Sequence, residues 1–277
     1  MATIKVMWRR GMASLLLGWA VSSCAWAATS APASVYLEDM TSPELRERIA
    51  QGATIALIPI GGTEQNGPVM TLGKHNARAR ALAGMIARQL GDAVVAPVIS
   101  YVPEGSIRPP TAHMRFTGTI SIPDSAFEGM LEGAARSLIQ HGFRTVVFLG
   151  DHGGYQKSEA RVAAKLSQPG AKLGSARVVA LRTYYDVTQQ GYVADLKAKG
   201  HGDAEIGSHA GLADTSLSLA VDPQSVRQEA LRATRPWTPS EGVYGDPRHA
   251  TADLGQMGVH RIVASSVEAI RELAGSH

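Results

Sequence analysis

Acidic and histidine side chains, the residue types that bind divalent metals and carry protons in hydrolytic enzymes, follow directly on apolar runs of this sequence. The first run, residues 53–59, is followed by Glu64, Asn66 and His75. Later clusters contain Glu104, His113, Asp151, His152, His209 and Asp214. Because separate segments each place such side chains past an apolar run, they predict one shared polar site whose residue types could bind a metal or carry protons.

The apolar runs have the composition of strands that are buried on both faces of a parallel sheet. They are rich in Val, Ile and Leu and continuous rather than alternating, at residues 54–60, 93–99, 145–149 and 177–181. Helical patterns lie around and between them, at residues 43–51, 77–90, 125–141, 157–167, 215–220 and 262–273. This order predicts an α/β fold, a three-layer sandwich with a mostly parallel central sheet. Ligands bind outside the carboxyl ends of such strands, where the polar clusters lie.

The composition and charge exclude some classes of partner. The 277 residues are 44% hydrophobic and 18% charged, as in ordinary globular proteins. The formal net charge is +3 and the pI is about 9.1, but Lys and Arg are scattered, with no basic run interleaved with aromatic residues. We therefore expect no nucleic-acid partner.

The first 27 residues are typical of a secretory signal peptide. Lys5, Arg9 and Arg10 precede a short apolar stretch that ends in Ala25-Trp26-Ala27, the small-residue pattern of a cleavage site. We predict a signal peptide over residues 1–27, a linker over 28–35, one domain over 36–277 and a periplasmic location. The pair Arg9-Arg10 leaves a twin-arginine export route open. The apolar stretch is too short to span a membrane.

Cys24 is the only cysteine of the chain. The segment Val21-Ser22-Ser23-Cys24 resembles a lipoprotein box, so a lipid anchor at Cys24 is the alternative to cleavage after Ala27. In both cases the domain has no disulfide and no thiolate metal ligand. A metal would be bound through nitrogen and oxygen atoms.

Five segments match, in the same order, the motifs of one known family. They read GGTEQNGPVMTLGKHN, FTGTIS, LGDHGGYQ, HAGLADTS and GDPRHATADLG. The chain therefore resembles the creatininase (creatinine amidohydrolase) family from Tyr36 to about Ile270. The resemblance implies a metal-dependent amidohydrolase with a parallel-sheet α/β fold and a two-metal centre that hydrolyses a cyclic amide or a related C–N bond. It also implies a homo-oligomer, commonly a hexamer.

The resemblance assigns metal-binding and proton-carrying roles to particular residues. Glu64 matches the family's first acidic ligand, His152 matches its ligand in the HGG turn, and His209 matches a histidine proposed as a proton carrier. Asp214 replaces a glutamate of the family motif. It is expected as a fourth ligand or as a partner of a ligating histidine, with a helix cap as the alternative.

Two substitutions separate this chain from the family motif. Asn66 replaces a histidine, and His75 replaces the aspartate that bridges the two metals. A neutral imidazole offers one lone pair to one metal, whereas a carboxylate can bridge two. We therefore expect a mononuclear centre formed by Glu64, His75 and His152, with zinc as the metal and manganese as the alternative.

The catalytic cycle also needs a proton donor and groups that contact the substrate. We expect His209 to act as the general acid, with a pKa near the working pH, and Asp151 and Glu104 as second choices. The expected substrate contacts are Asn66, His113, Gly153, Gly154 and Tyr155, among which the two glycine amides would stabilise an oxyanion.

Two functions fit these residues. The first is an exported amidohydrolase that cleaves a C–N bond of a small, in some cases cyclic, amide. The alternative is a catalytically degenerate family member that binds a small molecule in the periplasm, because several motif positions are substituted. Creatinine itself is disfavoured as the substrate, because Trp237 is the only tryptophan outside the first 27 residues.

Overall fold

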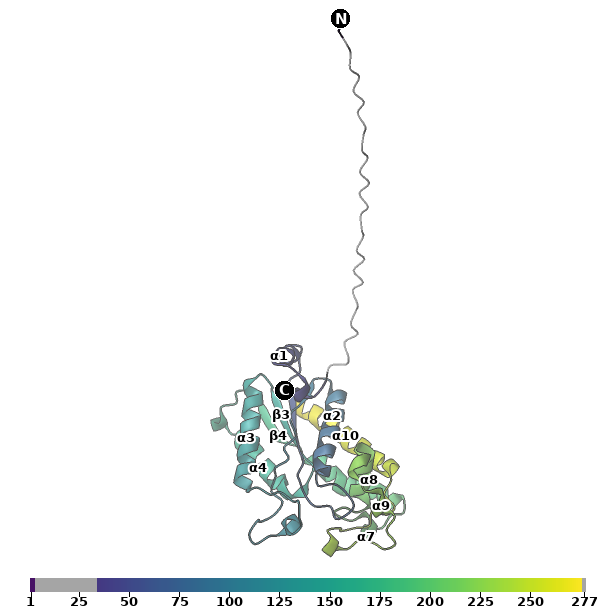
Figure 1. Cartoon of the computed structure of the whole chain (residues 1–277). Helices are drawn as coiled ribbons and strands as arrows, with labels where there is room; N and C mark the ends of the chain where they lie inside the picture. Colours follow the sequence, from purple (N-terminus) through teal and green to yellow (C-terminus); the bar gives the residue numbers. More distant parts are fainter. Residues whose placement is uncertain (3–33, 276–277) are drawn as a thin grey trace. The chain divides into compact units, whose positions relative to one another are not determined.

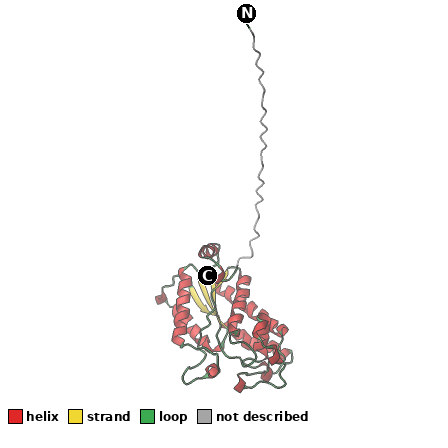
Figure 2. Ribbon diagram, in the orientation of Figure 1, coloured by secondary structure: helices red, strands yellow, loops and turns green. Residues whose placement is uncertain are grey.

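Parallel strands form the sheet at the centre of the structure, a computed structural model that describes residues 1–2 and 34–275 (Figures 1 and 2). Within these residues the strands are β1 (Ile55–Ile60), β2 (Ala93–Val95), β3 (Thr145–Gly150) and β4 (Arg177–Ala180), in the spatial order β2-β1-β3-β4. The register pairs the last residues of β1 and β3, Ile60 with Gly150. The loops that follow β1 and β3 therefore begin side by side.

Helices cover both faces of the sheet. On one face, α3 (Asp124–Gln140) and α4 (Gln156–Leu166) pack against β1, β3 and β4 (Figure 1). On the other, α2 (Lys74–Leu90) packs against β1 and β2, and α8 (Leu212–Val221) and α10 (Ala252–Gly275) extend that layer. The expected three-layer α/β sandwich with a parallel sheet is confirmed.

Shorter helices connect and border these layers. They are α1 (Ser42–Ala50), α5 (Arg182–Val187), α6 (Val193–Ala198), α7 (Asp203–Ile206) and α9 (Gln228–Leu231). Helix α1 begins at Ser42 rather than after it, because Thr41 is the N-cap and forms a capping box with Glu44. The expected signal peptide with Cys24, and the expected linker up to residue 33, lie outside the described residues.

Helix α10 begins ten residues before the start that the sequence pattern predicts. Gly255 and Gly258 weaken the helical pattern of this first part, because glycine is a poor helix former. The reason for Gly255 is tertiary: a Cβ at this position would lie 1.9 Å from the carbonyl oxygen of Ser216 in α8. The glycine therefore permits the close contact between α10 and α8.

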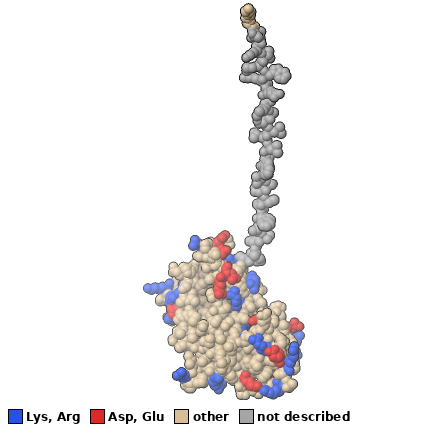
Figure 3. Space-filling view, viewed as in Figure 1, with Lys and Arg blue, Asp and Glu red and all other residues tan. Residues whose placement is uncertain are grey.

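The distribution of surface charge and the apolar length of the helices bear on which partners the protein can bind. On the face shown in Figure 3, Lys, Arg, Asp and Glu side chains are scattered, with both signs present. In the described part of the chain, no helix is long and apolar enough to cross a membrane.

Candidate metal centre

The turn after β1 is built to bring Glu64 into the interior. Gly62 has a φ of +148°, and a Cβ there would lie 2.7 Å from Oε1 of Glu104, so the glycine lets the Glu104 carboxylate approach. Asn66 braces the same turn, because its amide donates to the backbone carbonyls of Glu64 (3.0 Å) and Thr71 (2.9 Å). The Glu64 carboxylate is completely buried.

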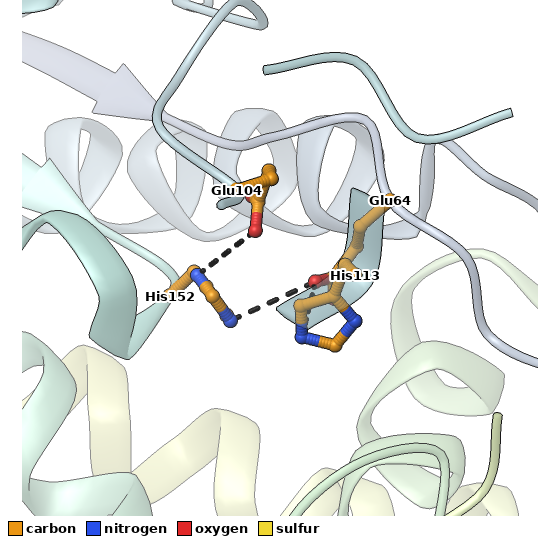
Figure 4. Close-up of side chains that lie close together, drawn as sticks. All are labelled: Glu64, Glu104, His113 and His152. Atoms are coloured by element: carbon orange, nitrogen blue, oxygen red, sulfur yellow. Dashed lines mark ion pairs between the residues drawn. The ribbon is translucent and has the colours of Figure 1, made fainter. Parts of the chain in front are cut away.

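Glu64, Glu104, His113 and His152 form a compact group, called here the four-residue cluster (Figure 4). One ligand atom from each lies within 4.8 Å of the others. Oε2 of Glu64 is 3.2 Å from Nε2 of His113 and 3.6 Å from Nε2 of His152, and Nδ1 of His152 is 3.6 Å from Oε2 of Glu104. Three loops supply the residues: those after β1, after β2 and after β3.

The carboxylates of this cluster are short of partners. Oε2 of Glu64 and both carboxylate oxygens of Glu104 are buried and have no hydrogen-bond partner among the described residues. Leaving a buried acceptor unpaired is costly, so such atoms mark a place where a cation or a proton belongs. Ligand atoms around a tetrahedral zinc ion, with bonds of about 2.0–2.2 Å, lie about 3.3–3.6 Å apart. The spacing and the donor types of the cluster therefore fit a divalent cation.

The protonation states of Glu64, His113 and His152 suit a cation, whereas Glu104 must lose a proton to bind one. Burial and the negative charge of Glu64 raise the pKa of Glu104 to about 9. Burial opposes a charge on Glu64, but His75 and Lys74 outweigh it and hold the pKa of Glu64 well below its usual range. Burial lowers the pKa of His152 to about 4 and also lowers the pKa of His113, so both rings are neutral at pH 7. Neutral imidazoles and an ionised carboxylate are the forms that bind metals.

His75 lies next to the cluster, with both of its ring nitrogens facing carboxylates. Nε2 is 2.8 Å from Oε1 of Glu64, and Nδ1 contacts Oδ2 of Asp151. Burial and Lys74 oppose a charge on His75, but Glu64 and Asp151 outweigh them and raise the pKa of His75. Nδ1 is also 2.9 Å from Nη2 of Arg78, so both ring nitrogens already have partners. In this arrangement His75 acts as a bridge between two acids.

Asp151 is held by several donors rather than facing the cluster. Nε of Arg78 lies 2.9 Å from its Oδ2, and the Tyr184 hydroxyl donates to its Oδ1 at 3.1 Å. Burial opposes ionisation of Asp151, but Arg78 and His75 hold its pKa below the usual value. Asp151 is therefore an ionised anchor for His75 and Arg78.

Asp214 forms ion pairs with two cations from the first two turns of α2. Its Oδ2 contacts Nζ of Lys74, and its Oδ1 is 2.7 Å from Nη1 of Arg78. The backbone amide of Ala210 also donates to Oδ2, at 3.0 Å. Burial opposes the charge of Asp214, but Lys74 and Arg78 hold its pKa well below the usual range. Lys74 joins Asp214 to Glu64, since its Nζ lies 3.5 Å from Oε1 of Glu64.

His209 lies at the edge of the cluster. Its Nε2 donates to the backbone carbonyl of Gln65 at 2.8 Å, and its Nδ1 faces Oε1 of Glu64 at 3.5 Å. The ring centroids of His209 and His113 are 4.5 Å apart. Burial and Lys74 lower the pKa of His209 to about 3, so the ring is neutral, in contrast to the sequence-based expectation of a pKa near the working pH.

The turns that present two of the histidines contain strained alanines. Ala112, before His113, has a φ of +47°, and Ala210, after His209, has a φ of +52°. A positive φ is unfavourable for residues with a Cβ, and such strain concentrates at functional sites. These turns therefore direct His113 and His209 toward the same place, at a local cost in folding free energy.

The other expected substrate contacts have different surroundings. Tyr155 is completely buried, and its hydroxyl donates to the carbonyls of Ile60 (2.9 Å) and Gly61 (2.6 Å), so it ties the end of β1 to the loop after β3. The amide of Gly154 donates to Nδ1 of His152 at 3.3 Å. Gly153 packs under Tyr185, whose hydroxyl would lie 2.5 Å from a Cβ at that position.

Two hollows meet at the cluster. The inner cavity has a volume of about 70 Å³, and its lining includes Lys74, Asp151, Tyr184 and Tyr185. The outer hollow has a volume of about 280 Å³, and its lining includes Gln65, His113, Arg115, Phe116 and Tyr244. Both are lined by His152, Ser208 and His209. The side chains of His113 and His152 are about one-fifth exposed, so a small molecule in the outer hollow can reach them.

Sequence reasoning missed Lys74 and Arg78, the two cations of the site. A single lysine or arginine in a sequence is usually a solvated surface residue, and neither occupies a position to which the family motif assigns a ligand. Their spacing of four residues, on either side of His75, was the available signal, because it places both on one face of a helix. Helix α2 begins at Lys74 rather than at residue 77, and this start puts both side chains in the interior.

Sequence comparison gives one family and several relatives. Residues 38–270 match the family described as Creatininase: Creatinine amidohydrolase. The chain is 30% identical over 223 residues to the mycofactocin precursor peptide peptidase of Mycolicibacterium smegmatis, covering 73% of this chain and 78% of the relative. It is 26% identical over 257 residues to the creatinine amidohydrolase of Pseudomonas putida, covering 86% and 97%. It is 28% identical over 210 residues to the 3-dehydro-scyllo-inosose hydrolase of Thermotoga maritima, covering 74% and 62%.

Solved structures with the same fold include several creatininases. A crystal structure of creatinine amidohydrolase superposes with a TM-score of 0.70 at 24% identity, covering 88% of this chain and 99% of that one. A manganese creatininase and a mutant creatininase of the Zn–Zn type each give a TM-score of 0.67 at 23% identity, covering 87% and 98%. These likenesses show that the fold is shared.

Proposed function

Because the chain belongs to the creatininase family, we propose that it is a metal-dependent hydrolase that cleaves a C–N bond of a small amide. One observation carries the proposal: three buried oxygens of Glu64 and Glu104 lack hydrogen-bond partners among the described residues, and two of them, Oε2 of each, face neutral histidines. The proposed metal ligands are Glu64, Glu104, His113 and His152, binding a single zinc or manganese ion.

The proposed ligand set differs from the set expected from the sequence in two residues. Glu64 and His152 are retained, whereas His113 and Glu104 take the places of His75 and Asp214. The surroundings of His75 support this change, because both of its nitrogens face carboxylates. Asp214 is paired with Lys74 and Arg78. His75 and Asp214 would then position Glu64 instead of binding the ion.

A divalent cation, when bound, lowers the pKa of a coordinated water and polarises a carbonyl group. His209 would handle the proton. Its Nε2 is fixed by the Gln65 carbonyl, so its Nδ1, which faces Oε1 of Glu64, is the atom that would accept and return a proton. The pKa of about 3 makes this ring a weak base when neutral and a good acid once protonated. Asp151 would hold His75, and through it Glu64, in place.

The outer hollow limits the substrate to a small molecule or to the end of a chain. Its volume of about 280 Å³ is near the lower end of ordinary ligand pockets, which begin at about 300 Å³. The relatives' names give a peptide, creatinine and an inosose as substrates, so they do not select one. We propose a small amide, cyclic or at a peptide end, whose carbonyl lies between His113 and His209.

We also propose that the protein is exported to the periplasm and forms a homo-oligomer. The support for export is the pattern of residues 1–27, with a basic start, an apolar stretch and Ala25-Trp26-Ala27. N-terminal sequencing of the protein recovered from a periplasmic fraction, with light scattering of the same sample, tests both statements. Recovery of the intact chain only from the cytoplasm would contradict export.

A panel of small amides tests the proposed activity. Creatinine, cyclic amides, formamides and short peptides are incubated with the zinc-loaded and manganese-loaded protein, and the products are measured by mass spectrometry. We expect hydrolysis of at least one class, its loss after chelation or in Glu64→Gln, and its recovery when metal is returned to the wild type. Binding of a panel compound without turnover by the metal-loaded protein would instead favour the small-molecule binding protein.

A further inference from the structure

Lys74 is an unusual first residue for α2, because its side chain is completely buried beside the four-residue cluster. A helix N-terminus already carries a partial positive charge, which disfavours a cation there. Burial also removes water from the ammonium group, which is tolerated only where carboxylates pair with it. A residue that violates local preference in this way is expected at a functional site.

The Lys74 ammonium lies between two carboxylates from distant segments. Its Nζ contacts Oδ2 of Asp214 and lies 3.5 Å from Oε1 of Glu64. Arg78 pairs with the second oxygen of Asp214, at 2.7 Å. An ammonium between two acids has the position that a metal ion bridging them would take.

The two oxygens of Glu64 face different surroundings. Oε2 faces His113 and His152 and has no hydrogen-bond partner among the described residues. Oε1 faces Lys74 and, at 2.8 Å, Nε2 of His75, which replaces the aspartate of the family motif. The Oε2 side therefore lacks positive charge, whereas the Oε1 side already has it.

We propose that the Lys74 ammonium takes the place of a second divalent cation in this centre. One metal ion would lie on the Oε2 side of Glu64, and the lysine side chain lies on the Oε1 side. This inference rests on the proposed function, which supplies the first ion. A carboxylate can bridge two cations, and here one of them belongs to the chain itself. A second metal ion on the Oε1 side would meet the charges of Lys74 and Arg78 at close range.

Metal stoichiometry tests this inference independently of activity. The wild type, Lys74→Met and Arg78→Met are equilibrated with excess Zn²⁺, desalted and analysed for zinc per chain by mass spectrometry. Folding is checked by circular dichroism. Methionine keeps the length of the lysine and removes its charge. We expect one ion in the wild type, two ions in Lys74→Met and one ion in Arg78→Met. Arg78→Met is the control because it also removes a positive charge, but one that does not contact Glu64.

The outcomes separate the two proposals. A wild type that binds no zinc refutes the proposed function together with this inference. A folded Lys74→Met that still binds one ion refutes this inference alone. A wild type with two tightly held ions refutes it together with the single-ion stoichiometry of the proposed function. If Lys74→Met does not fold, Co²⁺ titration of the wild type decides: electron paramagnetic resonance of one isolated ion at saturation supports the inference, and a spin-coupled pair contradicts it.

Discussion

Nδ1 of His152 lies 3.6 Å from Oε2 of Glu104, and Nε2 of the same ring lies 3.6 Å from Oε2 of Glu64. One imidazole from the loop after β3 thus joins two buried acids from the loops after β1 and β2 (Figure 4). The paired register of β1 and β3 makes this possible, because it starts their loops side by side. The geometry leads to the following predictions.

Glu104 is predicted to release a proton when a metal binds. Its pKa is raised to about 9, so it is protonated at pH 7 in the metal-free protein and must lose that proton to act as a ligand. Calorimetric titration with Zn²⁺ in buffers of different ionisation enthalpy should show the release of about one proton per ion. Glu104→Gln should remove this release and weaken binding. Equal proton release by variant and wild type would exclude Glu104 as its source.

The raised pKa of Glu104 also predicts how the stability of the metal-free protein depends on pH. Between its ordinary value of 4.5 and about 9, the folded state binds this proton and the unfolded state does not. The contribution of Glu104 to the free energy of unfolding therefore falls as pH rises through this window. Urea denaturation across this window should show a shallower fall for Glu104→Gln than for the wild type. Identical slopes would contradict the burial of an acid at this position.

His113 is predicted to be a direct metal ligand. Removal of a group that only supports a metal ligand weakens metal binding about 10–100-fold. Removal of a direct ligand should cost at least as much, so His113→Ala should weaken Zn²⁺ binding at least about 10-fold. His260→Ala is the matched control, because His260 is exposed on α10. Competition with a zinc-binding dye measures both affinities. Equal affinities for the two variants would remove His113 from the ligand set.

Tyr184→Phe is predicted to destabilise the fold. The Tyr184 hydroxyl is buried and donates to the ionised Asp151, and a hydrogen bond to a charged group is worth about 1.5–3 kcal/mol. Tyr185→Phe is the neighbouring control, because its hydroxyl makes no hydrogen bond within residues 34–275. It should change the free energy of unfolding by less than about 0.5 kcal/mol. Urea denaturation distinguishes the two, and equal losses would contradict the role given to Tyr184.

Gly255→Ala is predicted to disturb the packing of α10 on α8. The new Cβ would overlap the Ser216 carbonyl oxygen, and overpacking of this kind costs about 1–3 kcal/mol. Gly129→Ala in α3 meets no atom within 4 Å and should stabilise the protein by up to about 1 kcal/mol. Thermal melting of the two variants should therefore move in opposite directions. A rise in melting temperature for Gly255→Ala would refute the close contact.

The sheet and its flanking helices could be predicted from the sequence because the strands are buried on both faces. Such strands are continuous apolar runs, and this pattern can be recognised without knowledge of the tertiary structure. The first part of α10 could not be predicted, because Gly255 disfavours a helix locally and is explained only by its contact with Ser216.

The site was predictable as a region but not as a set of contacts. Glu64 and His152 are recognisable from motifs at strand ends, whereas His113 lies in a proline-rich loop whose path depends on tertiary packing. From the sequence alone, a charged residue such as Lys74 is expected to be solvated. Only the position at which α2 begins shows that Lys74 is buried. Charges that are buried in pairs are the feature that sequence patterns record least well.

Anomalous diffraction at the zinc edge, from crystals of the wild type equilibrated with Zn²⁺, locates the metal site directly. We expect one strong peak enclosed by Glu64 Oε2, Glu104, His113 and His152, with ligand distances of about 2.0–2.2 Å. A peak between His75 and Asp214 instead, or no peak beside Glu64 Oε2, would contradict the proposed ligand set.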